Sequence, residues 1–180
     1  MTLRHMPRME IGGHPSVKSD VSVKALKQWN PDLRASSDSE DATISILDPI
    51  GHDIWGYDVS AKRISAALRS IGERPVTVNI NSPGGDVFEG FAIYNMLQEH
   101  KAEVTVNVLG LAASAASVIA MAGDTVRVGR AGFVMIHNSW VIAGGDRNAF
   151  KEVADWLEPF DEAMNDVYAA RTGLPSAELA

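Results

Sequence analysis

Cysteine is missing from the 180-residue sequence, which excludes a disulfide framework and any cysteine-based metal site. No apolar run reaches the roughly 18 residues that a membrane span needs. Arg4 and Arg8 near the start are not followed by the apolar stretch of a signal peptide. Histidines and carboxylates do not cluster at metal-ligand spacing. We therefore expect a cytoplasmic protein with no metal, no organic cofactor and no membrane partner.

What remains is the composition of an ordinary folded domain with an excess of acid. Hydrophobic residues make up 46% and charged residues 22%, and the length suits one domain. The net charge of −7 argues against a nucleic-acid partner. Residues 1–41 are polar and rich in turn formers, with a possible short helix over Val21–Trp29. We expect them to form a partly disordered extension, either a tail or a partner-binding arm, before a domain spanning 42–180.

Hydrophobic periodicity predicts strands alternating with helices along that domain. Ser60 is placed to cap the first helix, Gly72 to end it, and Pro159 to kink or split the last one. The alternation predicts an α/β fold with a mostly parallel sheet, whose sites lie at the carboxyl ends of the strands. The expected strands are Thr43–Leu47, Val76–Ile80, Val104–Leu109, Thr125–Val128 and Gly132–Ile136; the expected helices are Ser60–Ile71, Phe88–Gln98, Ala112–Ala122 and Arg147–Arg171.

The stretch from Gly110 to Ser117 is unusually small, with four alanines and two serines among its eight residues. It follows a predicted strand and begins a predicted helix, so backbone N–H groups there are free to face a ligand. Ser114 is the candidate nucleophile at this junction. Ser117 is a rival, but one turn deeper its hydroxyl is expected to bond the preceding turn. No G-x-S-x-G pattern is present, so the nucleophile elbow of the α/β-hydrolases is not expected.

Two further loops leave strand ends at the same edge of the predicted sheet. Ser82-Pro-Gly-Gly85 lets the backbone approach a ligand without side chains in the way. The N–H groups of Gly85 and Ala115 can then form an oxyanion hole. His137 follows a strand directly and can take the proton of Ser114 as general base. Taken singly, each of these features is more often a plain turn, a packing residue or a structural histidine.

Three segments, in order and at similar spacing, resemble the Clp-type serine peptidases, the crotonase-like ClpP family. They are Asn81–Val87 with Gly90–Tyr94, Gly110–Ser117 and Met135–His137, within a match over roughly 42–175. The resemblance implies a ClpP/crotonase-like ββα superhelix with a long C-terminal handle helix. Over Gly110–Asp124, Met135–Asn138 and Tyr168–Leu174 the chain looks most like the phage and prophage head-maturation proteases, which cut scaffold and head proteins.

The resemblance assigns roles to individual residues. Ser114 is implied to be the nucleophile, His137 the general base, and the N–H groups of Gly85 and Ala115 the oxyanion hole, although many relatives have methionine where Ala115 stands. The family's third residue is an aspartate beyond the equivalent of Gly173–Ser176, and this sequence stops at Ala180. We therefore expect weak or no hydrolysis from these 180 residues, since loss of that carboxylate costs about 10⁴ in kcat. The resemblance does not match Asp161 or Asp166 to that position.

The resemblance also implies an assembly and a setting. A homo-oligomeric ring is expected, and the resemblance suggests heptamers stacked in pairs, with the loop Ile142–Asp146 pairing between subunits. A protein substrate, such as a capsid or scaffold protein, would lie as an added strand near Gly84, Gly85 and Val87. The expected location is the bacterial host cytoplasm, within an assembling procapsid, and no ATP-driven partner is needed.

Two alternatives stay open. One is a housekeeping peptidase subunit fed by an ATP-driven unfoldase, which the long N-terminal extension argues against. The other is a non-catalytic crotonase-like scaffold or acyl-thioester-binding relative, which would use two backbone N–H groups but no serine–histidine pair. Binding by that relative would survive the substitution Ser114→Ala.

Overall fold

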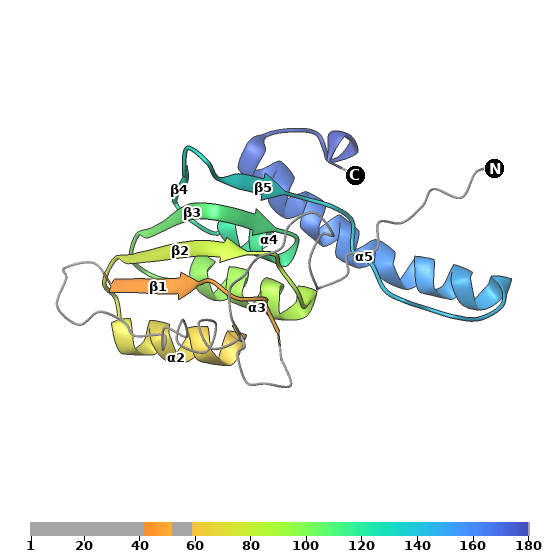
Figure 1. The fold of residues 1–180 in the computed structure, drawn as a ribbon, viewed down its shortest axis with the longest axis horizontal. Helices are drawn as coiled ribbons and strands as arrows, with labels where there is room; N and C mark the ends of the chain where they lie inside the picture. The colour runs from red at the N-terminus through yellow and green to blue at the C-terminus, as the bar shows by residue number, and fades with distance from the viewer. Residues whose placement is uncertain (1–41, 52–58, 180) are drawn as a thin grey trace, which may run out of the picture. The chain divides into compact units, whose positions relative to one another are not determined.

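The computed structural model describes residues 42–51 and 59–179, and Figure 1 shows their arrangement. The expected extension over 1–41, with its possible helix at 21–29, lies outside the described residues. The sequence order of strands and helices is the predicted one, followed by a short 3₁₀ turn, η1, that was not predicted. The elements are β1 (Ala42–Ile46), α2 (Ala61–Ile71), β2 (Val76–Ser82), α3 (Val87–Gln98), β3 (Val104–Ala113), α4 (Ala115–Ala120), β4 (Thr125–Val128), β5 (Phe133–Met135), α5 (Arg147–Thr172) and η1 (Ser176–Glu178).

The sheet is parallel in every described pairing, as predicted. Its order is β1-β2-β3-β4, and β5 also pairs with β3. Along β3, β4 lies beside the first half and β5 beside the last three residues, so both strands share one edge of β3. The carboxyl ends of β2, β3 and β5 therefore lie at the same end of the sheet, where the three predicted loops begin.

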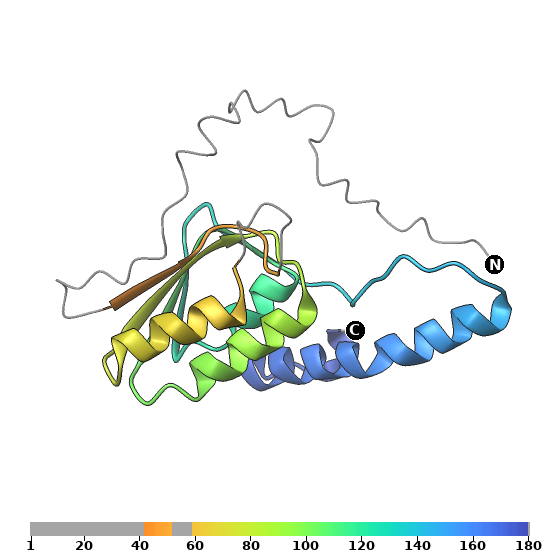
Figure 2. The ribbon, with the colours of Figure 1, turned by 90° about the horizontal axis from the view of Figure 1, so that it is seen from below.

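The two faces of the sheet differ in polarity because side chains alternate along a strand. One face of β1, β2 and β3 is fully buried and apolar, from Ile44 and Val78 to Val106. The opposite face is half-exposed and polar, and there the Asn107 side-chain amide donates to Asn79 Oδ1 at 3.1 Å. Helices α2, α3 and α4 lie together on one side of the sheet (Figure 2). The core thus forms between one apolar sheet face and these helices.

The ends of α2 and α3 show which polar groups satisfy the helix termini. Gly72 ends α2 with φ 70°, as predicted, a backbone angle that glycine adopts without strain. Ser60 is the N-cap residue of α2, but among the described contacts its side chain makes no capping bond. Instead Glu89, from the first turn of α3, accepts the N–H of Ala61 at 2.5 Å. Asp86 caps α3 by accepting the N–H groups of Phe88 and Glu89.

The boundary between β3 and α4 differs from the prediction. The helix was expected to begin at Ala112, but Ala112 and Ala113 extend β3, and α4 is only six residues long, Ala115–Ala120. Pairing of Leu111–Ala113 with Phe133–Met135 supplies the extra strand hydrogen bonds. Ser114 therefore lies at the sharp turn between the two elements rather than inside a helix.

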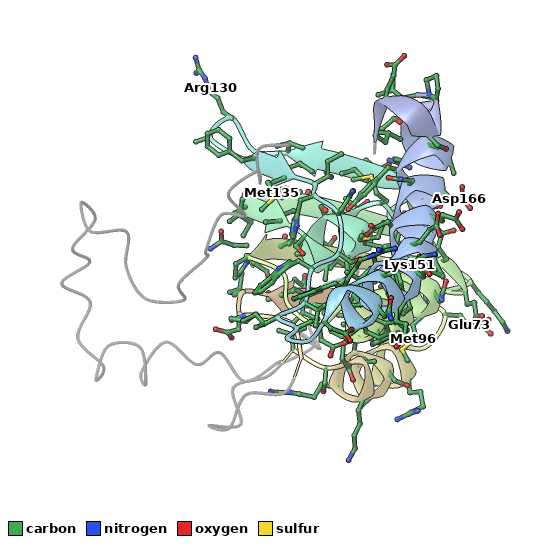
Figure 3. All side chains as sticks on the ribbon, turned by 90° about the vertical axis from the view of Figure 1, so that its right-hand side faces the viewer. Glu73, Met96, Arg130, Met135, Lys151 and Asp166 are labelled. Carbon is green, nitrogen blue, oxygen red and sulfur yellow. The ribbon has the colours of Figure 1, made fainter. Side chains whose placement is uncertain are left out.

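Helix α5 runs through Pro159 as one element of 26 residues, so the predicted split does not occur. Only its C-terminal half is anchored in the described core, where Met164 and Tyr168 pack with Val118 of α4. Asp146 caps its start by accepting two N–H groups, and Gly173 ends it in the left-handed conformation. In Figure 3, the labels Lys151 and Asp166 mark the two halves of this helix.

Candidate active site

Ser114 has a strained backbone. Its φ of 53° and ψ of −129° make it the sole non-glycine residue with positive φ in the described part of the chain. A side chain in this region costs on the order of 1–3 kcal/mol and persists only where the surroundings enforce it. A strained serine on a strand-to-helix turn is the geometry of a nucleophile elbow. The α/β-hydrolase pattern is absent, yet the turn has the strain that the pattern usually signals.

The glycine pair after β2 lies directly against this turn. A Cβ on Gly84 would come within 2.4 Å of the Ala113 carbonyl oxygen, 2.7 Å of Ser114 Cβ and 3.0 Å of the Ala115 nitrogen. Gly84 also has φ +89°, which favours glycine. The two loops that sequence reasoning paired are therefore in contact, and glycine is the residue that fits at the contact.

The segment after β1 orients the second glycine. Ile50 donates to the Gly84 carbonyl and accepts the N–H of Asp86, both at 2.9 Å, as in a parallel bridge to Gly85. In such a bridge the N–H and C=O of the residue between the two bonds point away from the partner. The Gly85 N–H accordingly has no partner among the described residues. The same is true, within those residues, of the Ala115 N–H at the start of α4.

A single hydroxyl ties these loops together. Ser82 Oγ donates to the Asp48 carbonyl at 2.7 Å and accepts the N–H of Gly84 at 3.2 Å. Burial raises the pKa of the Asp48 carboxyl, and the nearby Arg63 acts in the opposite direction. Both backbone groups of Gly84 are thus bonded inside the chain, so Gly84 contributes its missing side chain rather than a free donor.

β5 brings His137 to the neighbouring strand end. Ala113 is paired with Met135, and the Ser114 N–H donates to the Met135 carbonyl at 2.9 Å. A parallel ladder would next bond the His137 N–H to the Ser114 carbonyl. That carbonyl instead accepts the N–H of Ser117 at 2.8 Å, so the ladder stops and the chain leaves the sheet.

Ser114 and His137 therefore follow adjacent strand ends, and adjacent strands lie about 4.8 Å apart. Ser114 is half-buried, whereas His137 is exposed. Within the described residues no hydrogen bond joins the two side chains. The roles predicted for Ser114, His137, Gly85 and Ala115 stay predictions. The predicted substrate-contacting Val87 is the first residue of α3, and its N–H has no described partner.

Helix α5 contacts the segment that carries His137. Asp161 Oδ1 accepts both the N–H and the hydroxyl of Ser139, each at 2.6 Å. Asp166, the other helix carboxylate considered from the sequence, makes no described hydrogen bond. Asp161 thus restrains the chain two residues beyond His137 without contacting the imidazole. The sequence held no signal for this contact, because it joins residues 22 positions apart on different elements.

Ser117 and Tyr168 form a buried pair behind Ser114. Ser117 Oγ donates to the Ser114 carbonyl at 2.6 Å, the backward bond expected from the sequence. The same oxygen lies 2.7 Å from the Tyr168 hydroxyl, 51 residues away. Burial raises the pKa of Tyr168, and its hydrogen bond to Ser117 opposes that shift. Sequence reasoning treated Tyr168 only as an apolar position of the last helix.

Around His137 the surface is apolar and exposed. Strand β5, the segment after it and the first half of α5 expose large hydrophobic side chains to solvent, with Ile142 88% exposed. These side chains are Phe133, Val134, Met135, Ile136, Trp140, Val141, Ile142, Phe150 and Trp156, and we call them the outer apolar surface. Exposed apolar surfaces of this kind are often interaction sites in soluble proteins.

No group of three or more histidine, aspartate or glutamate side chains within 42–51 and 59–179 is arranged to hold a metal ion. None of the described helices is both long enough and apolar enough to cross a membrane.

Comparisons with known proteins point to one family. The Clp protease family model matches residues 40–180. The chain is 27% identical over 189 aligned residues to the ATP-dependent Clp protease proteolytic subunit 3 of Arabidopsis thaliana chloroplasts, covering 99% of this chain and 60% of that protein. It is 32% identical over 111 residues to the ATP-dependent Clp protease proteolytic subunit of Deinococcus radiodurans, covering 59% of this chain and 53% of that one.

The fold is similar to that of a solved relative. A mutant ClpP1 from Listeria monocytogenes superposes with a TM-score of 0.63 at 27% identity, covering 76% of this chain and 75% of the other. The predicted ClpP-like fold is therefore confirmed. The chain spans only 60% and 53% of the lengths of the two curated relatives.

Proposed function

This chain belongs to the Clp protease family, and we propose that it is a serine peptidase with Ser114 as nucleophile and His137 as general base. One observation carries the proposal: Ser114 is strained and lies against Gly84. The next residue of each loop, Gly85 and Ala115, has a backbone N–H with no partner among the described residues. Strain at a partly exposed serine is expected where the hydroxyl must be aimed.

The proposed reaction follows from these groups. Ser114 Oγ attacks the carbonyl carbon of a peptide bond while His137 takes the hydroxyl proton. The negative charge that develops on the carbonyl oxygen is met by the N–H groups of Gly85 and Ala115. His137 then gives the proton to the leaving amine, and the acyl group stays on Ser114. Water, deprotonated by His137, releases the acid and restores the serine.

The proposed substrate is a protein chain in extended form. The C=O of Gly85 points away from Ile50, and the N–H of Val87 is unpartnered within the described part of the chain. These groups lie on alternate residues, the spacing at which an added strand forms main-chain hydrogen bonds. Gly84 supports this edge sterically, because a side chain there would collide with Ser114.

The proposed working form is a ring of identical chains. The outer apolar surface supports this, since its side chains lie on the element that carries His137 and on the first half of α5. Burial of such side chains is worth about 25 cal/mol per Å², so leaving them in water is unfavourable. Packing against neighbouring copies would cover them and would hold the segment that carries His137.

For the biological role we propose maturation of a phage capsid, by cutting scaffold and head proteins. The resemblance of Gly110–Asp124, Met135–Asn138 and Tyr168–Leu174 to head-maturation proteases supports it. A second candidate is a subunit that works with an ATP-driven unfoldase, which is favoured by the names of the two curated relatives. Cleavage of a folded reporter only with unfoldase and ATP would favour the second role, and cleavage of purified scaffold protein without ATP the first.

A fluorophosphonate probe tests the chemistry directly, because it reports a single turnover at the serine. In line with the weak hydrolysis expected from these 180 residues, we expect slow covalent labelling that maps to Ser114 by peptide mass analysis and that disappears in Ser114→Ala. The control Ser176→Ala changes an exposed serine of η1 and is expected to label like the wild type. Labelling of Ser117, or equal labelling of the Ser114→Ala variant, would reject the proposal.

A further inference from the structure

A line of hydroxyl groups runs from α5 to the backbone of Ser114. Ser117 Oγ donates its proton to the Ser114 carbonyl at 2.6 Å, and the Tyr168 hydroxyl lies 2.7 Å from the same Ser117 oxygen. A hydroxyl has one proton to give, and that of Ser117 is already committed. Tyr168 is therefore the donor to Ser117, and the order of donation is Tyr168, Ser117, Ser114 carbonyl.

The two side chains of this line, Ser117 and Tyr168, are buried. Ser117 is 0% and Tyr168 3% exposed, and their neighbours are the apolar Val118 and Met164. A buried hydroxyl is unfavourable unless it is hydrogen-bonded, so packing alone would be served better by alanine and phenylalanine. A tyrosine hydroxyl is protonated, and thus a donor, at neutral pH, and burial raises the pKa of Tyr168 further from neutrality.

The group at the end of this line is the one that fixes the strained turn. The Ser114 carbonyl accepts the N–H of Ser117 at 2.8 Å and that of Val118 at 3.4 Å, besides the Ser117 hydroxyl. The Ser114 N–H is held by the Met135 carbonyl. With φ at 53°, the residue returns to an ordinary conformation if these restraints weaken. Any change in the orientation of this peptide swings the Ser114 hydroxyl.

We propose that Tyr168 is a positioning residue for Ser114, acting through Ser117; this rests on the proposed peptidase function. By donating to Ser117, Tyr168 fixes the rotamer in which the Ser117 proton points at the Ser114 carbonyl. It thereby holds the strained backbone that aims the nucleophile. Tyr168 itself touches neither substrate nor a transferred proton, so it acts on the rate of attack and leaves substrate affinity and the pH dependence unchanged.

The test uses the whole chain with four variants: Tyr168→Phe, Ser117→Ala, the double variant, and the control Tyr94→Phe. Tyr94 is a half-buried tyrosine that packs beside the same cluster, and its hydroxyl has no described hydrogen bond. The fluorophosphonate labelling rate at Ser114, and kcat and KM on a short peptide, are measured well below each variant's unfolding temperature. Under those conditions a merely structural role leaves the labelling rate of the folded protein unchanged.

We expect Tyr168→Phe to label Ser114 about three- to tenfold more slowly, the range of one neutral hydrogen bond. Its kcat falls by the same factor and KM stays constant, whereas Tyr94→Phe matches the wild type. Since Tyr168 acts through Ser117, adding Tyr168→Phe to Ser117→Ala causes no further loss.

Three results would overturn the proposal. Labelling of Tyr168→Phe at the wild-type rate removes the positioning role while the peptidase function stands. If the two substitutions slow labelling of Ser114 by factors that multiply in the double variant, Tyr168 does not act through Ser117. If wild-type Ser114 does not label at all, the peptidase function itself is wrong, and the positioning role falls with it.

Discussion

The two sides of the candidate site are built differently. On the Ser114 side, Gly84 lies against Ser114 and Ala115, and both backbone groups of Gly84 and of Ser114 are bonded within the chain. On the His137 side, the segment after β5 is exposed and is bonded to α5 through Ser139. The first side is packed against the core. The second is an exposed segment, residues 136–146, which we call the strap and which carries part of the outer apolar surface.

This difference teaches which part of the site the chain completes by itself. A strained serine needs rigid surroundings, and the loops after β1, β2 and β3 supply them. A general base needs only the right distance and direction in the reacting complex, and these can be set on assembly or substrate binding. In the proposed ring, neighbouring copies that cover the outer apolar surface would take part in that step.

The largest expected effect tests whether the two sides form one site. His137→Ala should lower the fluorophosphonate labelling rate at Ser114 by about 10²- to 10⁴-fold, the usual contribution of a general base. The control His100→Ala removes a histidine that bonds the Arg74 carbonyl far along the chain, and should stay within about twofold. An unchanged labelling rate in His137→Ala would show that His137 is not the general base for Ser114.

Glycine-to-alanine changes on the two sides compare their packing. Gly84→Ala would bring its new carbon to 2.4 Å from the Ala113 carbonyl at a positive φ, so we expect a loss of about 3 kcal/mol or more in unfolding free energy. Gly144→Ala on the strap meets nothing within 4 Å, and its effect should lie within about 0.5 kcal/mol. Urea unfolding measures both, and equal losses would contradict the contrast.

A charge placed on the strap tests its proposed cover. Ile142 is 88% exposed, so Ile142→Asp should leave the fold stable while lowering the mass of the assembly seen by sedimentation velocity at micromolar concentration. Lys62→Asp, an exposed change on α2, should keep the wild-type mass. If the wild type sediments as a monomer, or Ile142→Asp as a full ring, this surface is not the ring contact.

The anchor between strap and α5 should matter less. Asp161→Ala removes the acceptor of both Ser139 bonds, and we expect labelling of Ser114 to slow about three- to tenfold as His137 is held less firmly. Proteolysis within residues 139–146 should become faster. Asp166→Ala, which changes an exposed carboxylate one and a half turns further along, should do neither.

The smallest expected effect concerns alkaline pH. Burial raises the pKa of Tyr168 above its ordinary value of 10.0, so the unfolded chain loses this proton at lower pH than the folded chain. Between those two pKa values the folded state binds more protons, and stability falls as pH rises through that window. Tyr168→Phe should flatten the fall above pH 10 seen by urea unfolding. If the unfolding free energy of Tyr168→Phe falls with pH as steeply as that of the wild type, another group causes the fall.

The sequence predicted the sheet better than it predicted the turn at the site. Alternating apolar residues located β1, β2 and β4 within two residues of the observed ends, because that pattern is local. The end of β3 depends on pairing with β5, so the small residues before Ser114 gave no local sign of a strand. Capping of α2 by Glu89 rather than Ser60 was missed for the same reason.

The candidate site was predicted as a meeting of loops, and in the fold Gly84 lies against Ser114. The supporting contacts were not predictable. Tyr168 and Ser117 are 51 residues apart, and Asp161 and Ser139 are 22 apart, on elements whose relative placement only the fold defines. The strain at Ser114 likewise follows from those contacts rather than from the residue type.

The length of α5 has a mechanical consequence. From Met164 to Arg147 the helix extends about 26 Å at 1.5 Å per residue, and Met164 and Tyr168 are its buried residues. Over such an arm, a 2 Å displacement of the distant end tilts the anchored end by only about 4°. The far end can therefore adjust to neighbours of varied shape while the hydroxyl groups behind Ser114 stay within bonding distance. In the proposed ring, α5 would therefore act as a long lever arm that passes only a small tilt from a subunit contact to the region of the nucleophile.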